Sequence, residues 1–158
     1  MSGYATVEQA DIYVAEHYIS TDPLRIAWNA LSQEDKQVIL NVSAEAINSL
    51  PYPGRKLYPD QENAFPRYPS QQVPTAIFAA QIENAISVSD SSSSEDAMLY
   101  QRMWSFGIAS YRIGNLSESV GNASGGASLG AQMLQNGIVS TKAQALLKPF
   151  IGGAYCIE

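Results

Sequence analysis

The sequence contains very little of the chemistry on which most enzymes and metalloproteins rely. Its 158 residues include one cysteine, Cys156, and one histidine, His17. A single cysteine cannot form an internal disulfide, so we expect a reducing compartment. Two such residues are too few for a zinc site. A catalytic Cys–His pair stays open in principle, although a histidine inside a predicted helix is more often a surface or packing residue. We therefore expect no enzyme activity, and no catalytic, metal-binding or cofactor-binding residues.

Long apolar runs and phosphate-binding motifs are missing as well. No apolar stretch reaches the roughly 18 residues that suggest a membrane span, and no apolar run follows a basic start, so we expect neither a membrane helix nor a secretory signal. The segment "GNASGGASLG" lacks the Gly-Lys-Ser/Thr ending of a phosphate loop. Asp60 and Glu62 lack the spacing of a calcium-binding loop.

Positive charge is scarce. The chain carries nine basic and fifteen acidic side chains, a net charge of −6 and an isoelectric point of about 4.7. Residues 1–50 carry −5, residues 51–75 carry +1, residues 76–113 carry −2 and residues 114–158 are neutral. High-affinity phosphate contact needs clustered Lys and Arg, and this chain offers no such cluster.

What is present is mainly helical patterning with strong start signals. Thr6 with Gln9 forms a capping box, and Asp22 and Ser32 are suitable N-caps. The apolar spacing predicts helices over 7–19, 23–31, 33–49, 75–88 and 95–113, and a further one that is capped at Ser140 or Thr141 and interrupted at Pro149. We predict a mainly α fold, a bundle of about four to five helices in one domain over residues 1–150. A short extended segment near 114–121, a Gly/Ser-rich loop over 121–131 and an extended C-terminal arm over 151–158 complete it. Whether 114–131 is a hairpin or a loop stays open.

The segment between the third and fourth predicted helices, residues 51–74, holds six of the eight prolines. Because proline limits the freedom of the unfolded chain, we predict an ordered loop, with Phe65 as the residue that pins it. Four aromatic residues (Tyr52, Tyr58, Phe65, Tyr68) alternate here with three basic ones (Arg55, Lys56, Arg67). This pattern is typical of single-strand binding by stacking, but aromatic residues beside prolines more often pack onto the body, and the structural interpretation is favoured.

The order of the motifs resembles the tailed-phage head-to-tail connector family, also called adaptors or head-completion proteins. The resemblance covers nearly the whole chain and rests on "YATVEQADIYVAEH", Trp28, "PGRK", "DQENAFPR", "VPTAIFAAQIENA", "IGNLSESV" and "ALLKPFI". Some relatives carry the label "DnaT-like single-stranded DNA-binding protein". The resemblance implies a helical protein that forms a homo-oligomeric ring, commonly of twelve subunits, beneath the portal of the virion.

Such a ring extends the DNA channel at the head–tail junction, or neck, and offers a docking surface to the tail. The implied partners are the portal protein, tail or further neck proteins and other copies of the chain. The resemblance also implies assembly in the host bacterial cytoplasm and genomic DNA that passes through the channel without specific binding. It implies no cofactor and no membrane. The apolar segment 95–113 and the acidic balance fit a subunit-buried helix and a channel wall that repels phosphate. The resemblance places a subunit or portal interface at Asp60, Gln61, Phe65, Pro66, Arg67, Tyr155 and Ile157.

Within that interface, Arg67 is expected to pair with Asp60 or with a carboxylate of a neighbouring subunit.

The alternative function is single-stranded DNA binding. It predicts salt-sensitive binding of oligonucleotides, weakened when Arg55, Lys56 and Arg67 are changed together.

Overall fold

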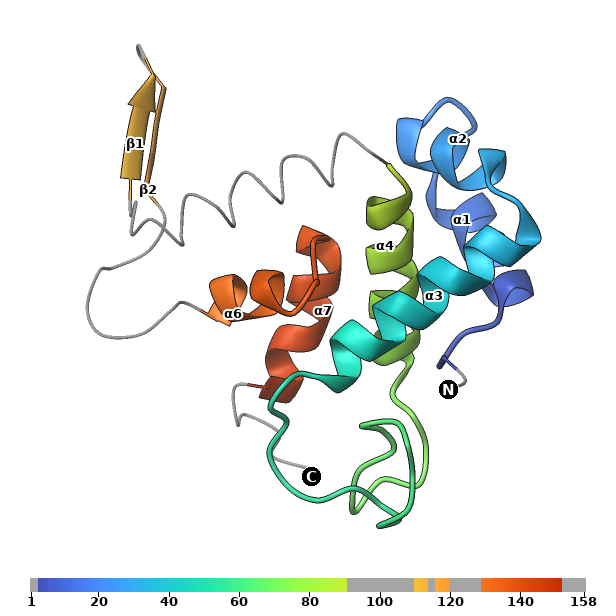
Figure 1. The fold of residues 1–158 in the computed structure, drawn as a ribbon, viewed down its shortest axis with the longest axis vertical. Coiled ribbons are helices and arrows are strands. Elements are labelled where there is room, and N and C mark those ends of the chain that lie inside the picture. Colours follow the sequence, from blue (N-terminus) through green and yellow to red (C-terminus); the bar gives the residue numbers. More distant parts are fainter. Residues whose placement is uncertain (1–2, 91–109, 114–115, 120–128, 152–158) are drawn as a thin grey trace.

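Helices make up most of the part of the chain that the structure describes. The computed structural model describes residues 3–90, 110–113, 116–119 and 129–151 (Figure 1). The helices in these ranges are α1 (Val7–His17), α2 (Pro23–Ala30), α3 (Gln33–Asn48), α4 (Thr75–Ser89), α6 (Leu129–Gln135) and α7 (Thr141–Ile151). The strands are β1 (Ser110–Ile113) and β2 (Leu116–Ser119), which pair antiparallel. The predicted mainly α fold is therefore confirmed. Within the described ranges, no helix is both long and apolar enough to cross a membrane.

The first three helices begin where the capping signals place them. The Thr6 hydroxyl accepts the Gln9 N–H at 3.3 Å, and the Gln9 side chain accepts the Thr6 N–H at 3.0 Å. Asp22 caps α2 and Ser32 caps α3 through their side-chain oxygens. Each cap satisfies a backbone donor that the helix itself leaves unpaired, which is why these boundaries can be predicted from local sequence.

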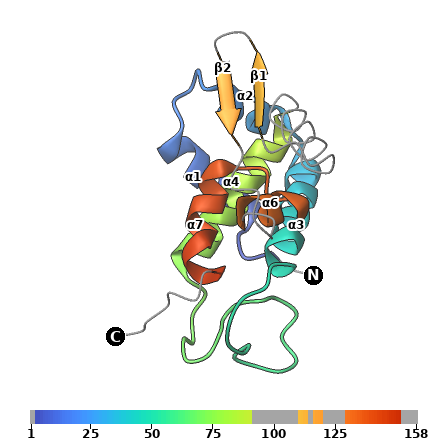
Figure 2. The same cartoon turned by 90° about the vertical axis from the view of Figure 1, so that its left-hand side faces the viewer.

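Helix α4 is the central helix of the body. It packs against α2, α3 and α7, and Figures 1 and 2 show it surrounded by its neighbours. Most of its residues are buried, including the polar residues Gln81, Glu83 and Asn84. A buried polar side chain must find hydrogen-bond partners, and all three do. The Gln81 side chain, for example, accepts the Ala5 N–H at 2.8 Å and donates to the Leu40 carbonyl at 2.8 Å.

The carboxylate of Glu83 connects three helices. It accepts hydrogen bonds from the hydroxyls of Tyr13, at 2.8 Å, and Tyr18, both contributed by α1 and its C-cap. The Lys142 ammonium of α7 lies 3.7 Å from the same carboxylate. Burial, reinforced by the neighbouring carboxylate, raises the pKa of Tyr13 and of Tyr18. Both phenols therefore remain hydrogen-bond donors to Glu83 at neutral pH.

Two apolar clusters form the core on either side of α4. One joins α4 to α1, α2 and α3 around Trp28, Leu40 and Ile86. The other joins α4 to α3, α7 and the proline-rich segment around Ile47, Phe65 and Leu147. The second cluster matters for the site described below, because it is the one onto which residues 51–74 fold.

Three predictions about the second half of the chain need correction. Residues 110–113, the end of the helix predicted over 95–113, form strand β1; residues 95–109 lie outside the described part. Tyr111 and Ile113 favour extended structure, and β1 and β2 flank Gly114 and Asn115, a residue pair typical of two-residue hairpins. Of the stretch 114–131, for which a hairpin or a loop was left open, residues 116–119 pair with β1 in an antiparallel ladder; residues 114–115 and 120–128 lie outside the described part.

The other two corrections concern α6 and α7. Helix α6 begins at Leu129, inside the predicted Gly/Ser-rich loop. The helix ends at Gln135, and Gly137, two residues further on, has φ of +88°, a backbone conformation that favours glycine. Pro149 does not interrupt α7, which continues to Ile151. Proline in the last turn removes only one backbone hydrogen bond, and Phe150 keeps this turn in place by packing on the core. The C-terminal arm predicted over 151–158 lies, beyond Ile151, outside the described residues.

Asp11 of α1 connects this helix to α2 and α3. Its carboxylate accepts hydrogen bonds from the indole of Trp28 and the ammonium of Lys36, both at 2.8 Å. Trp28 is fully buried, and the Lys36 side chain is nearly so. Partial burial alone would raise the pKa of Asp11, but the hydrogen bonds and the charge of Lys36 outweigh it and lower the pKa.

We predict that Asp11→Asn destabilises the protein by about 1–2 kcal/mol at neutral pH, after allowance for the partial exposure of the carboxylate. A carboxyl whose pKa is lowered by folding stabilises the folded state above its unfolded pKa, about 3.9. The difference between the variant and the wild type should therefore be constant above about pH 5 and shrink as the pH falls below about 4. Urea unfolding at a series of pH values measures it. Glu16→Gln, which removes an exposed carboxylate of the same helix, is the control and should show little effect at any pH; a pH-independent loss for Asp11→Asn would contradict the assignment.

Candidate functional site

The proline-rich loop, residues 51–74, folds back on itself at the end of the body that is opposite α2 (Figures 1 and 2). The Leu57 N–H donates to the Pro66 carbonyl at 3.1 Å, and the Tyr68 N–H donates to the Arg55 carbonyl at 3.0 Å. The two arms of the loop therefore run antiparallel over a short distance. The prediction that this segment is ordered is confirmed.

Arg67 holds the base of the loop together from inside. Its guanidinium donates to four backbone carbonyl oxygens, those of Tyr52, Pro53, Gly54 and Ala64. Gly54 has φ of +80°, which favours glycine and explains the Pro-Gly-Arg sequence at this point. The expectation that Arg67 pairs with Asp60 is wrong, because backbone carbonyls occupy its donors; Asp60 is exposed.

Gln61 and Lys56 brace the tip of the loop. The Gln61 side-chain amide donates to the carbonyls of Asn63, at 2.8 Å, and Pro66, at 2.9 Å, while its oxygen accepts the Tyr58 N–H at 3.1 Å. The Lys56 ammonium donates to the carbonyl of Gln61 at 3.0 Å and to that of the next residue. Backbone groups that would otherwise be left to solvent are thus paired within the loop.

Phe65 pins the loop to the core, as predicted. It is 5% exposed and lies edge-to-face with Tyr52, at a ring-centroid distance of 4.7 Å, and with Phe150, at 5.6 Å. A third edge-to-face contact, at 6.4 Å, joins it to Tyr4 near the N-terminus. Edge-to-face pairs add to the stabilisation that burial gives. The loop, the start of the chain and the end of α7 therefore meet at one side chain.

Asn48, in the last turn of α3, ties the same elements by hydrogen bonds. Its side-chain oxygen accepts the Ala64 N–H at 2.7 Å and the Tyr4 hydroxyl, and its amide donates to the Asn63 side chain at 2.9 Å. Burial raises the pKa of Tyr4 to about 12 and also raises that of Tyr52, so both phenols are neutral at physiological pH. No sequence pattern pointed to Tyr4 and Asn48, because their partners lie far away in sequence.

Four of the aromatic and basic side chains of the loop are exposed, and we call them the loop surface: Arg55, Lys56, Tyr58 and Tyr68. Tyr58 is 62% and Tyr68 is 58% exposed. The Arg55 guanidinium lies over the Tyr68 ring, 4.5 Å from its centroid. The structure thus divides the seven aromatic and basic residues of the segment. Tyr52, Phe65 and Arg67 are structural, whereas the loop surface faces solvent and presents two rings and two cations.

The remaining candidates do not join this surface. His17 stacks on Tyr13, with ring centroids 3.9 Å apart, and its Nδ1 lies 2.9 Å from the Tyr13 carbonyl. Cys156, Tyr155 and Ile157 lie outside the described residues. Among the residues that the structure describes, no three His, Cys, Asp or Glu side chains gather as metal ligands.

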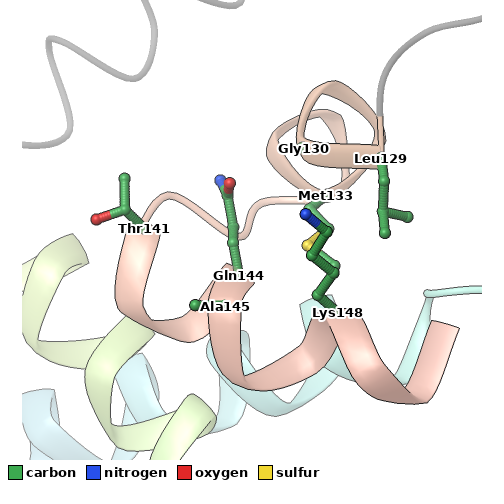
Figure 3. Close-up of a pocket in the computed structure, with 7 residues that line it drawn as sticks. All are labelled: Leu129, Gly130, Met133, Thr141, Gln144, Ala145 and Lys148. Carbon is green, nitrogen blue, oxygen red and sulfur yellow. The ribbon is translucent and has the colours of Figure 1, made fainter. Parts of the chain in front are cut away.

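An open groove of about 440 Å³ lies between α6 and α7 (Figure 3). It is lined by Leu129, Gly130, Met133, Thr141, Gln144, Ala145 and Lys148. Lys148 is the single charged side chain in this lining, which contains no aromatic ring. The groove therefore offers neither stacking planes nor clustered charge, and the loop surface remains the candidate site.

Comparison with protein families gives a match over nearly the whole chain. The model of the family described as "Putative DnaT-like ssDNA binding protein" matches residues 2–158. Searches of curated proteins and of solved structures found no match.

This match corrects the resemblance on which the expected function rested, because the family that matches is not a connector family. The connector function is therefore wrong. The same holds for the virion-assembly role, for the portal, tail and ring partners, and for DNA that passes without specific binding. Because the match covers far more than half of the sequence, the chain belongs to the family of DnaT-like single-stranded DNA-binding proteins.

Proposed function

We propose that this protein binds single-stranded DNA through the loop surface, in a binding role without a catalytic step. The observation that carries the proposal is the exposed Arg55–Tyr68 pair on an ordered loop, in a chain whose family is described by single-stranded DNA binding. Unpaired bases expose their planar faces, and proteins hold them with aromatic rings and nearby cations. Lys56 and Tyr58 add a second cation and a second ring to the same loop.

The charge distribution supports this location. When the sequence is divided into residues 1–50, 51–75, 76–113 and 114–158, only the second segment has a net positive charge. The first and third segments, which supply helices α1 to α4, are acidic. A phosphate chain is therefore repelled by most of the molecule and is tolerated best at the loop. Arg55 and Lys56 lie there on the exposed side of the loop.

The order of the loop also favours binding. Its backbone groups are paired through Arg67 and Gln61, and Phe65 fixes it to the core. A surface that is already held in position loses little conformational entropy when a ligand arrives. A small contact area can then give measurable affinity.

We predict that Arg55→Ala/Lys56→Ala weakens binding of a fluorescein-labelled 15-nucleotide thymidine strand about tenfold at low salt. This corresponds to about 0.7 kcal/mol for each lost charge. Fluorescence anisotropy measures the affinity. Arg67 is left unchanged in this experiment, because its four hydrogen bonds hold the base of the loop. Lys56 also donates to two loop carbonyls, so the melting temperature of the double variant must match that of the wild type before the affinities are compared.

The matched control is Thr21→Glu/Asn29→Asp. It lowers the net charge by the same two units at exposed positions of the opposite end, in and beside α2. Its affinity should stay within about twofold of the wild type, because charges that far apart are screened. A flat titration of the wild-type protein at low salt would refute the proposed function, and equal losses in the two variants would place the site elsewhere.

A further inference from the structure

The pair formed by Arg55 and Tyr68 has a geometry that goes beyond general attraction for DNA. The guanidinium covers one face of the ring at 4.5 Å, and the Tyr68 N–H donates to the Arg55 carbonyl, so backbone and side chains hold the two residues together. Tyr68 nevertheless remains 58% exposed. A planar group can therefore stack on the ring while Arg55 supports it from behind.

Charge alone gives this surface little affinity. Of the three basic residues in the loop, Arg67 donates to four carbonyls of the loop itself. Lys56 divides its ammonium between two further carbonyls. At most two cations can contact phosphates, and the surrounding protein is acidic. The larger part of the binding free energy must then come from the bases, since stacking contributes more than an exposed ion pair.

We infer that the loop surface recognises the unpaired bases of the strand rather than its phosphate chain, with Tyr68 as a stacking platform backed by Arg55. Tyr58 supplies a second ring on the same loop. This inference rests on the proposed function and specifies its ligand as a strand with accessible base faces. Duplex DNA hides those faces inside its own stack and is a poor ligand for this surface.

A consequence for salt dependence follows from the two available cations. Each phosphate neutralised on a single strand contributes about −0.7 to the slope of log K against log salt concentration. Two contacts give a slope of about −1.4. A protein that held the strand mainly by its phosphates would show a much steeper slope.

The test compares two labelled 15-mers, oligothymidine and a strand of the same length in which every base is replaced by an abasic tetrahydrofuran unit. Both carry the same phosphates. Anisotropy titrations of the full-length protein should show the abasic strand bound at least about fivefold more weakly, the lower limit expected for one lost stack. Tyr68→Ala should lose a similar factor on oligothymidine, whereas Tyr68→Phe, which keeps the ring, should bind like the wild type.

The results of these titrations distinguish base recognition from DNA binding in general. Equal affinity for both strands, an unchanged Tyr68→Ala variant, or a salt slope steeper than about −3 overturns base recognition while DNA binding stands. No binding of either strand at low salt overturns the proposed function as well. Thermal unfolding of Tyr68→Ala provides the folding control, and its melting temperature should match that of the wild type because the side chain is exposed.

Discussion

Phe65→Ala is expected to lower the free energy of unfolding by about 3–5 kcal/mol, the range for deleting a buried aromatic side chain. The ring is 5% exposed and contacts three other rings, those of Tyr4, Tyr52 and Phe150. Its loss leaves a cavity where the loop, the N-terminal segment and α7 meet. Urea unfolding followed by circular dichroism measures the change, and Phe65→Leu should fall between the variant and the wild type.

Tyr52→Phe is the matched control for this prediction. Tyr52 packs on Phe65, but its buried hydroxyl has no hydrogen-bond partner among the described residues. Removing an unpaired buried hydroxyl should leave stability unchanged or raise it by about 1 kcal/mol. A loss of less than about 1 kcal/mol for Phe65→Ala would show that the loop is not pinned by this side chain.

Asn84→Ala should be nearly as damaging, with a loss of at least about 3 kcal/mol, because it leaves several buried groups unpaired at about 1–3 kcal/mol each. Asn84 is 1% exposed. Its oxygen accepts the N–H groups of Val139, at 2.8 Å, and Ser140, at 3.4 Å. Its amide donates to the Gly137 carbonyl at 3.1 Å and to the Ser43 hydroxyl at 3.3 Å. One side chain of α4 thus pairs with three backbone groups of the segment that connects α6 to α7. Thermal or urea unfolding measures the loss.

Asn136→Ala offers a comparison in the same connection. Asn136 also makes two side-chain hydrogen bonds, to Gln132 and Ser49, but both are exposed. Water replaces such bonds when they are lost, so the expected change is below about 1 kcal/mol. Similar losses in the two asparagine variants would mean that burial of Asn84 is not what makes it important.

The first half of the fold could be predicted because its determinants are local. The caps at Thr6, Asp22 and Ser32, together with the apolar spacing, place α1 to α3 within two residues of their observed ends. Helix α4 was also predicted nearly in full. Its central position was not, because Gln81, Glu83 and Asn84 suggest a solvated face. These side chains are buried because their hydrogen-bond partners come from segments that are distant in sequence. The apolar spacing within one helix carries no information about those partners.

The candidate site was predictable in composition but not in arrangement. The sequence places aromatic and basic residues together in residues 51–74 and correctly selects Phe65 as the pin. It does not distinguish Arg67, whose guanidinium donates to four backbone carbonyls, from Arg55, whose guanidinium lies over the Tyr68 ring. That difference depends on how the loop closes around Gly54 and on its contacts with Tyr4 and Asn48, and both are long-range properties of the folded chain.

A long segment without regular secondary structure is usually the first place where a protease cuts a folded protein. Trypsin cleaves after Arg and Lys, and three such residues lie in this loop. Phe65 is buried in the cluster that the loop shares with α3, α4 and α7, so we expect that extending this part of the loop into a protease removes the ring from the core and disrupts that cluster. Cleavage of the loop is thereby coupled to opening of the helical body. We therefore expect the loop to resist cleavage for as long as the helical body stays folded.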